Sequence, residues 1–511
     1  MQIIDNKALL LKLRNPKQVT TVIPNSKLLN EHEVLVKWGL PETQALRGMN
    51  IKVPSPIEGR YSWTGKYAPM THQKTTASFL TLNQRAFCFN EAGTGKTASA
   101  IWAADFLMKQ GIITRALVIC PISIMDSAWL TDLFTFAMHR TAGIAHGTAN
   151  KRREIIAAKP DFLIINYDGL EIVRDEIEAA GYDLIIVDEA SHYKNALSKR
   201  WKVLRSLVKP ETWLWMMTGT PAAQGPEDAY GLAKLVNPAG VPRFFGAWRD
   251  MVMQKESQFR WKPKPTATQS VFRALQPAIR FTKDECLDLP DMIYVKRDVA
   301  LTKQQETYYK KLKAQAAMEV AGEQITAVNA AVMMGKLLQI SAGASYTESG
   351  DTVQFDISNR YKILREAIDE SSHKVLVFVP FKHVIDMLSE KLAADGITNE
   401  IIRGDVSAGA RTDIFKRFQE QPNPRVLVIQ PAAAAHGVTL TAANTVVWWA
   451  PTSSLETYAQ ANARVHRKGQ TNKCTVVQLQ GSSVERRVYK LLDEKIDVHA
   501  KVVDLYKDLL D

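Results

Sequence analysis

The sequence predicts an α/β protein with two doubly wound parallel-sheet lobes, helical insertions and a small N-terminal module. Short runs that are apolar throughout alternate with amphipathic, helix-like segments, as expected for parallel strands covered on both faces. This alternation lapses in the middle of the chain and then returns, which indicates two separate sheets. A chain of 511 residues is also longer than one hydrophobic core usually supports.

The chain is expected to divide into three parts. Residues 1–62 alternate short apolar runs with Pro and Gly breaks, and we expect a small module there that contains strands. We assign residues 63–290 to the first lobe and residues 291–511 to the second. Insertions are expected at about 237–290, where Pro, Trp, Arg and Lys are frequent, and at about 301–345, where the pattern indicates long helices.

Each strand expected in the two lobes is a short stretch rich in Val, Ile, Leu or aromatic residues and bounded by turn formers. In the first lobe they are RAFCFN (85–90), RALVICP (115–121), DFLIINY (161–167), DLIIVDE (183–189) and TWLWMMTGTP (212–221). In the second lobe they are KVLVFVP (374–380), TNEIIRG (398–404), RVLVIQP (425–431), NTVVWWAP (444–451) and CTVVQLQ (474–480).

Composition narrows the class of protein. The formal net charge is +12 and the sequence pI is near 9.3, which fits a polyanionic partner. The four cysteines, Cys88, Cys120, Cys286 and Cys474, form no CxxC pair, which argues against a zinc site or a disulfide framework. No signal peptide and no apolar stretch of membrane-spanning length is evident, so we expect a cytoplasmic protein without a membrane partner.

A phosphate loop is predicted at NEAGTGKT (90–97), between an expected strand and a helix-like segment. Gly93 and Gly95 let the backbone wrap around phosphates, and the amides at the helix start donate to them. Lys96 is placed to reach the β- and γ-phosphates of ATP, and the Thr97 hydroxyl is placed to ligate Mg²⁺. The alternative is a glycine-rich turn with an incidental lysine.

Two adjacent carboxylates end the expected strand in DLIIVDEAS (183–191). Carboxylates at the end of an apolar strand are costly unless they serve a cation or water. Asp188 is placed to hold Mg²⁺, and Glu189 to orient and deprotonate the attacking water. A helix N-cap is the alternative, although it explains one acid better than two. The next expected strand ends in TGTP (218–221). Its threonines could link the nucleotide site to movement elsewhere in the protein, or the segment could be only a hydroxyl-rich turn.

A basic segment near the end of the chain, QANARVHRKGQ (460–470), contains no acidic residue. On a helix, Gln460, Arg464 and Arg467 fall at i, i+4 and i+7 and share one face. Polar groups aimed the same way suggest one anionic target. A solvated basic helix is the alternative.

With these segments in register, the chain resembles the Swi/Snf-related ATPases of helicase superfamily two, from about residue 67 to 495. The resembling segments are YAPMTHQ (67–73) for adenine recognition, NEAGTGKT for motif I, LVICPISIMDSAW (117–129) for motif Ia, DEASHYKN (188–195) for motif II, MTGTPAAQ (217–224) for motif III, KVLVFVPFKHVIDML (374–388) for motif IV, PAAAAHGVTLTAANTVVWWAP (431–451) for motif V and QANARVHRKGQ for motif VI. Two departures stand out: Ser191 replaces the commoner histidine of motif II, and only Gly437 matches the glycine-rich turn of motif V.

The resemblance implies RecA-like lobes, with ATP and Mg²⁺ as cofactors. It implies the catalytic residues Lys96, Asp188, Glu189, Arg464 and Arg467, the last two as arginine fingers that neutralise charge on the γ-phosphate. It implies the nucleotide-binding residues Gln73, Gly93, Thr94, Gly95, Lys96, Thr97 and Gln460, of which Gln73 contacts the base. The metal ligands are then Thr97 and Asp188.

The resemblance also implies movement on double-stranded or branched DNA in recombination, repair or replication, by a compact bacterial or phage protein. Two other functions stay open. One is an RNA helicase, because motifs I and II are shared across the superfamily, although HRKGQ favours the DNA enzyme. The other is a nucleic-acid-binding ATP switch without processive movement, which needs the same site.

Overall fold

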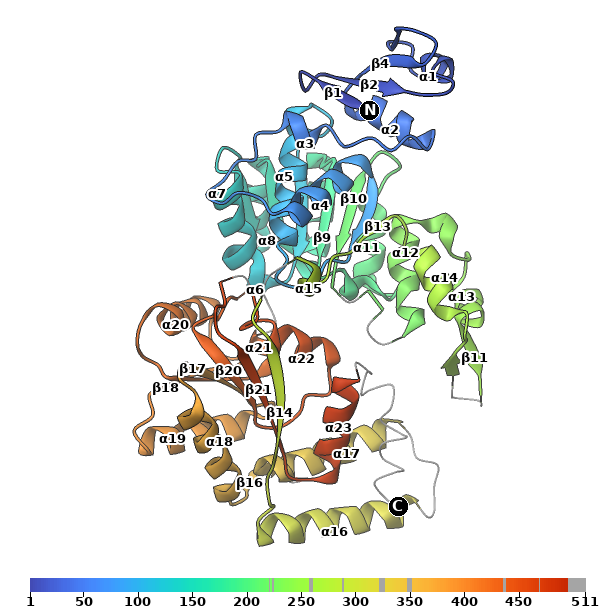
Figure 1. The fold of residues 1–511 in the computed structure, drawn as a ribbon. Coiled ribbons are helices and arrows are strands. Elements are labelled where there is room, and N and C mark those ends of the chain that lie inside the picture. Colours follow the sequence, from blue (N-terminus) through green and yellow to red (C-terminus); the bar gives the residue numbers. More distant parts are fainter. Residues whose placement is uncertain are drawn as a thin grey trace. The chain divides into compact units, whose positions relative to one another are not determined.

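The computed structural model describes residues 1–494 except 220, 223–224, 257–260, 287–288, 321–326, 347–351, 435–437 and 468. The chain divides into two compact units, Met1–Cys286 and Leu287–Asp511 (Figure 1). Among the described residues, no helix has the length and apolar character that a membrane crossing requires.

The first unit is built on a seven-stranded parallel sheet in the order β13-β5-β10-β9-β6-β8-β7. The strands are β5 (Arg85–Cys88), β6 (Ala116–Cys120), β7 (Ala142–Ala145), β8 (Phe162–Asn166), β9 (Leu184–Asp188), β10 (Trp213–Met217) and β13 (Ala278–Ile279). All five strands expected in this lobe are confirmed. The two strands at the sheet edges, β7 and β13, were not expected from the sequence.

Helices cover both faces of this sheet because successive strand residues point to opposite sides. Ala86 and Cys88 of β5 belong to one apolar core, and Phe87 belongs to the other. The first core packs against α4 (Thr71–Leu82), α5 (Lys96–Lys109) and α7 (Thr131–Phe136). The second packs against α8 (Ala149–Ala157), α9 (Tyr167–Ile172), α10 (Arg174–Ala180), α11 (Lys199–Leu207) and α12 (Ala229–Val236). The sheet is therefore doubly wound, as predicted.

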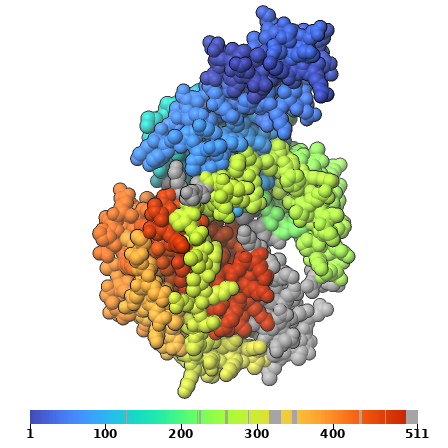
Figure 2. Space-filling model, viewed as in Figure 1, coloured from blue at the N-terminus to red at the C-terminus, as the bar shows by residue number. Residues whose placement is uncertain are grey.

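Two smaller structures are attached to this lobe. At the N-terminus an antiparallel sheet has the order β1 (Gln2–Ile4), β2 (Ala8–Lys12), β4 (Glu33–Lys37) and β3 (Lys27–Leu28). Helix α1 (Lys17–Val22) lies between β2 and β3 in the chain, and α2 (Leu40–Gly48) and α3 (Ile57–Arg60) follow β4. Beyond α12, a helix–hairpin–helix segment contains α13 (Phe245–Val252), β11 (Met253–Lys255), β12 (Trp261–Pro263) and α14 (Ala267–Ala274), and it lies beside α12 (Figures 1 and 2).

The second unit is built on a six-stranded parallel sheet in the order β14-β21-β20-β17-β19-β18. The strands are β14 (Met292–Asp298), β17 (Lys374–Phe378), β18 (Asn399–Ile402), β19 (Val426–Ile429), β20 (Ala443–Trp448) and β21 (Cys474–Gln480). The main helices are α16 (Lys303–Val320), α17 (Ala327–Ala342), α18 (Ser358–Glu370), α19 (Lys382–Ala394), α20 (Ala408–Glu420), α22 (Leu455–Asn462) and α23 (Ser483–Asp493). The five strands expected here and the fold class of two parallel-sheet lobes are confirmed, whereas β14 was not expected.

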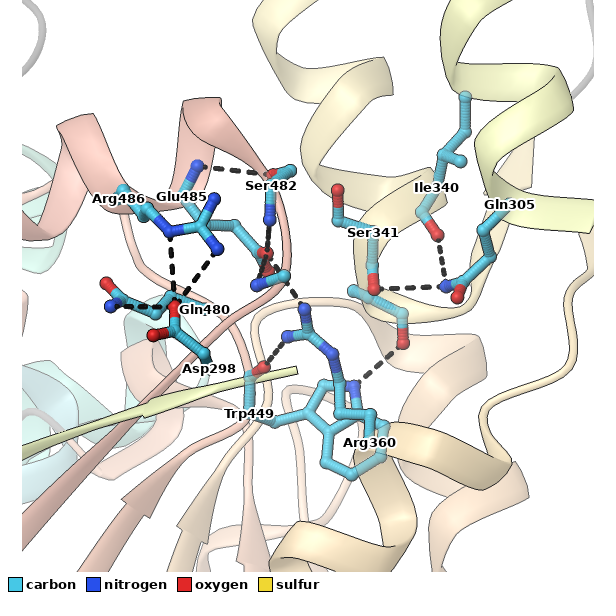
Figure 3. Close-up of polar contacts among 12 residues, drawn as sticks. Asp298, Gln305, Ile340, Ser341, Arg360, Trp449, Gln480, Ser482, Glu485 and Arg486 are labelled. Carbon is cyan, nitrogen blue, oxygen red and sulfur yellow. Dashed lines mark hydrogen bonds and ion pairs between the residues drawn. The ribbon is translucent and has the colours of Figure 1, made fainter. Parts of the chain in front are cut away.

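A buried ion pair joins three elements of the second unit (Figure 3). Arg360 of α18 lies 2.8 Å from Glu485 of α23, and the two side chains are 2% and 0% exposed. The same Glu485 oxygen accepts hydrogen bonds from the backbone N–H groups of Gly481 and Ser482, at 2.7 and 3.0 Å. Arg360 also donates to the carbonyl of Trp449, next to the end of β20. The two charges therefore pair with each other and bind backbone groups, which a buried ion pair requires. The Nε of Arg360 and the Oε1 of Glu485 have no hydrogen-bond partner among the described residues.

Replacing Arg360 with Met should destabilise the second unit by about 3–5 kcal/mol, because Glu485 is left buried without its cation. Urea unfolding followed by circular dichroism measures the loss. Arg297→Met is a matched control, since Arg297 pairs with Glu370 at 2.7 Å where the side chains are 35% and 59% exposed. That change should cost less than about 1 kcal/mol. Equal losses in the two variants would contradict the role given to the buried pair.

Candidate functional site

The predicted phosphate loop and the acid pair lie at the same edge of the sheet. Strand β10 lies between β5 and β9, and Met217 is aligned with Cys88 on one side and Asp188 on the other. Because these strands are parallel, their carboxyl ends share an edge, which is where ligands bind in open α/β sheets. The structure thus brings together the two motifs that the sequence placed about ninety residues apart.

Two glycines shape the loop before α5. Gly93 and Gly95 have φ values of +91° and +81°, and Gly95 is the N-cap of the helix. The Nζ of Lys96 donates to the carbonyls of Asn90 at 2.9 Å and Glu91 at 3.3 Å, so the ammonium lies back over the loop. A lysine and helix-start amides around such a turn fit a bound polyphosphate. Thr97, in the first turn of α5, is partly exposed.

The start of α4 lies against this loop. The Oε1 of Gln73 accepts a hydrogen bond from the Met70 backbone N–H at 2.9 Å, and the His72 Nε2 is 2.7 Å from the carbonyl of Thr94. A Cβ added at Gly95 would lie only 2.0 Å from the Gln73 Nε2. The structure therefore places Gln73 directly beside the predicted phosphate loop.

Asn90 lies where the usual phosphate-loop pattern has its first glycine, and its side-chain amide connects two other segments of the lobe. It is 1% exposed. Its Nδ2 donates to the Thr76 Oγ1 at 2.8 Å, and its Oδ1 accepts from the Phe281 backbone N–H at 3.0 Å. The amide thus joins α4 to the segment after β13 across the base of the loop. These partners could not be predicted from local sequence, because they are distant along the chain.

Asp188 is a buried carboxylate at the end of β9. Burial raises the pKa of this carboxyl above its usual range, and the charge of Lys96 opposes that shift. One oxygen accepts from the Trp129 indole N–H at 3.0 Å and the other from the Glu189 backbone N–H at 3.0 Å. Trp129 lies inside the segment that resembles motif Ia, but its contact with Asp188 was not predicted.

The residues at this edge fit a magnesium ion that is shared with a nucleotide. A buried carboxylate near a lysine suits a site whose ligand itself carries charge. The described residues contain no group of three or more His, Cys, Asp or Glu side chains that would hold a metal ion. Mg²⁺ characteristically binds through one or two protein oxygens together with phosphates and water. Asp188 and Thr97 would be its protein ligands.

Glu189 has a strained backbone. Its φ and ψ are +50° and +55°, the left-handed region that a residue with a Cβ rarely adopts. The buried Tyr167 hydroxyl donates to the Asp188 carbonyl at 2.7 Å and is 3.4 Å from the Glu189 carbonyl. Strain of this kind persists where surrounding contacts impose it, and it concentrates at functional sites. Tyr167 was missed by sequence reasoning, since a single tyrosine after a strand carries no specific signal.

Strand β10, which lies between β5 and β9, ends next to the loop at 90–97. The Thr218 backbone N–H donates to the Cys88 carbonyl at 3.0 Å. A Cβ at Gly219 would lie 3.7 Å from both the Ala92 N and the Asn90 O, so the chain passes in contact with the loop. Thr220 and residues 223–224 of the same motif lie outside the described residues.

In the second unit the basic segment is not one helix, and the prediction of a shared helical face was wrong. Helix α22 ends at Asn462, so Gln460 is helical while Arg464 and Arg467 follow the helix. The two arginines nevertheless converge, because their Nη1 atoms lie 3.4 and 2.8 Å from the same Val438 carbonyl. Gln460 is paired with Glu456, at 3.2 Å. Gly437 and Lys468 lie outside the described residues.

The chain thus has two parallel-sheet lobes, and the loop at 90–97 and an acid pair share one sheet edge of the first. Comparison with known families shows to which class of protein this architecture belongs. The SNF2-related domain model matches residues 72–343, and the helicase conserved C-terminal domain model matches residues 359–469. The chain belongs to the SNF2-related family of ATP-dependent enzymes.

Several curated proteins and solved structures are similar to this chain. An uncharacterized ATP-dependent helicase of Mycoplasma genitalium is 26% identical over 82% of the chain and 41% of its own length. The SWI/SNF-related matrix-associated actin-dependent regulator of chromatin subfamily A-like protein 1 of Xenopus tropicalis is 24% identical over 84% and 44%. The chain therefore spans less than half the length of these relatives. The Sulfolobus solfataricus SWI2/SNF2 ATPase core in complex with dsDNA aligns at TM-score 0.42 and 23% identity, over 88% of this chain and 94% of that one.

Gly95→Ala should weaken ATP binding because the new methyl group meets the Gln73 amide and because φ at this position is positive. Gly111→Ala is the matched control: Gly111 also has a positive φ, +67°, but its Cβ would meet nothing within 4 Å. Both variants should lose about 1 kcal/mol of stability or more from backbone strain. Only Gly95→Ala should reduce the affinity for a fluorescent ATP analogue. Unchanged affinity in that variant would contradict the placement of the nucleotide.

Proposed function

We propose that this chain is a DNA-stimulated ATPase that uses Mg²⁺-ATP hydrolysis to move on double-stranded or branched DNA. The observation that carries the proposal is the convergence of the loop at 90–97 and the acids Asp188 and Glu189 on one sheet edge. Membership of the SNF2-related family supports the use of ATP. Recombination, repair or replication are the processes that such a motor would serve.

The residues of the first unit would divide the chemistry among them. Lys96 neutralises the β- and γ-phosphates, and the amides at Gly93, Thr94 and Gly95 donate to them. Thr97 and Asp188 would hold Mg²⁺, which when bound would supply positive charge at the transferred phosphoryl group. Glu189 orients the attacking water and accepts its proton. Gln73, beside the loop, contacts the adenine.

The arginines of the second unit would complete the reaction. In this proposal Arg464 and Arg467 contact the γ-phosphate and stabilise the charge that develops in the transition state, with Gln460 helping to orient them. A guanidinium suits this role because its planar fork binds phosphate oxygens in pairs. ATP binding and hydrolysis would then alternate two arrangements of the lobes, which is how a chemical cycle is converted into movement.

DNA as the substrate is supported by charge and by relatives. The net charge of +12 fits a polyanion, whose phosphates are contacted without regard to sequence. A similar protein of Danio rerio, 23% identical, is named chromodomain-helicase-DNA-binding protein 1-like.

ATP turnover by the purified chain tests this function, measured alone and with duplex DNA, branched DNA, single-stranded DNA and RNA. Stimulation by duplex or branched DNA is expected, and Lys96→Ala should abolish turnover in every case because the γ-phosphate loses its cation. Stimulation by RNA alone would identify an RNA helicase. Turnover that responds to DNA without displacement of a roadblock on that DNA would indicate an ATP switch.

Tyr167→Phe should lower kcat by about 10- to 100-fold with little change in KM for ATP, because small displacements of a catalytic group cost this much. The change removes the hydroxyl that holds the carbonyls of Asp188 and Glu189. Tyr193→Phe is the matched control: Tyr193 is fully buried beside Tyr167, and its hydroxyl has no hydrogen-bond partner among the described residues. Equal kcat values in the two variants would show that Tyr167 does not position the acids.

A further inference from the structure

The first unit contains a cavity of about 580 Å³ apart from the sheet edge described above. One wall is the segment 194–197, which follows the turn after the two acids. The opposite walls are α12, with Tyr230 and Lys234, and the start of α13, with Phe244 and Phe245. A volume of this size accommodates a group as large as a nucleotide.

The lining combines aromatic rings with the cations Lys194, Lys234 and Arg243, and it also includes the carboxylates of Glu227 and Asp228. Asp228 pairs with Lys194 at 3.4 Å, which leaves Lys234 and Arg243 as the cations beside the rings. Phe244 and Phe245 are 68% and 38% exposed, and the Phe245 ring lies edge-on to Tyr230 with centroids 5.5 Å apart. The Arg243 guanidinium is 5.3 Å from the centroid of the Phe244 ring. Lys234 donates to the Pro242 carbonyl at 3.2 Å, which holds its ammonium at the cavity. Aromatic platforms flanked by cations are the chemistry that binds unpaired nucleobases and their phosphates.

Part of the cavity lining belongs to a basic segment of the chain. Residues 238–274 contain seven Lys or Arg and two Asp or Glu. Lys255 and Lys262 of the β11–β12 hairpin are exposed, so their charges face solvent. The Arg249 guanidinium stacks over the Trp261 ring at 4.2 Å. A strand of nucleic acid whose base entered the cavity would therefore have cations available for its phosphates.

We propose that this cavity binds an unpaired base of single-stranded DNA and that the substrate is DNA with a single-stranded part. The inference rests on the proposed function, which makes DNA the polymer. It adds a site for single strands to a motor otherwise defined by duplex DNA. Stacking on Phe244 supplies affinity without base specificity, since every base has a π-face.

The walls of the cavity also connect it to the hydrolytic acids. A Cβ added at Gly231 of α12 would lie 2.2 Å from the Lys194 carbonyl and 2.5 Å from the Tyr193 carbonyl. The Trp201 indole N–H donates to the Gly231 carbonyl at 2.8 Å. Helix α12 thus packs backbone against backbone on the turn that follows Glu189. A base held between α12 and residues 194–197 acts on that turn directly.

Phe244→Ala tests the site by fluorescence anisotropy, with a labelled blunt duplex and the same duplex carrying a short oligothymidine tail, at one fixed salt concentration. The variant should bind the tailed duplex about tenfold more weakly than the wild type and the blunt duplex equally well. Phe272→Ala is the matched control, since Phe272 is 66% exposed and does not line the cavity. Phe244→Trp should retain binding, because it keeps a stacking surface.

The outcomes separate this inference from the function on which it rests. Loss of tailed-duplex binding in Phe244→Ala alone supports the site. Equal binding of both DNAs by the wild type, or equal losses in Phe244→Ala and Phe272→Ala, would overturn the single-strand site while leaving a duplex motor intact. Failure of the wild type to bind any DNA would overturn both.

Discussion

The first unit is organised around one buried carboxylate, that of Asp188. A charge in this place is costly without compensation. Burial raises the pKa of Asp188, while the charge of Lys96 and hydrogen bonds from Trp129 and from the Glu189 backbone favour its ionised form. These groups come from three separate segments, and the sheet order β5-β10-β9-β6 is what brings them together. We propose that a ligand with phosphates, together with a divalent cation, completes this site.

The same carboxylate explains the strain beside it. The chain must turn sharply after Asp188, and Glu189 takes a left-handed conformation while the Tyr167 hydroxyl holds both carbonyls. Such strain fixes where the Glu189 side chain can point. The turn continues into residues against which α12 packs closely at Gly231. A movement of the helices that follow β10 can therefore reach Glu189, the proposed general base, through this close packing.

Much of the architecture was predictable, because apolar runs define parallel strands and the glycine-rich loop defines its own conformation. The missed features depend on contacts between distant residues. Nothing local in QANARVHRKGQ shows that α22 ends at Asn462. The residues after the helix are held by contacts of the Gln470 amide, which donates to the carbonyls of Ala443 and Val465 at 2.8 and 3.1 Å. The two-residue strand β13 is likewise too short to be detected by periodicity. The hydrogen bond from Trp129 to Asp188 joins residues fifty-nine positions apart.

We propose that the edge formed by loop 90–97 and Asp188 binds ATP together with Mg²⁺. Isothermal titration calorimetry of the wild-type chain with ATP, in the presence of Mg²⁺ and then of EDTA, measures this binding. We expect one site per chain, with an affinity for ATP that falls sharply when the metal is removed, because the Asp188 carboxylate then repels the phosphates. Equal affinity with and without Mg²⁺, or no binding in either condition, would contradict it.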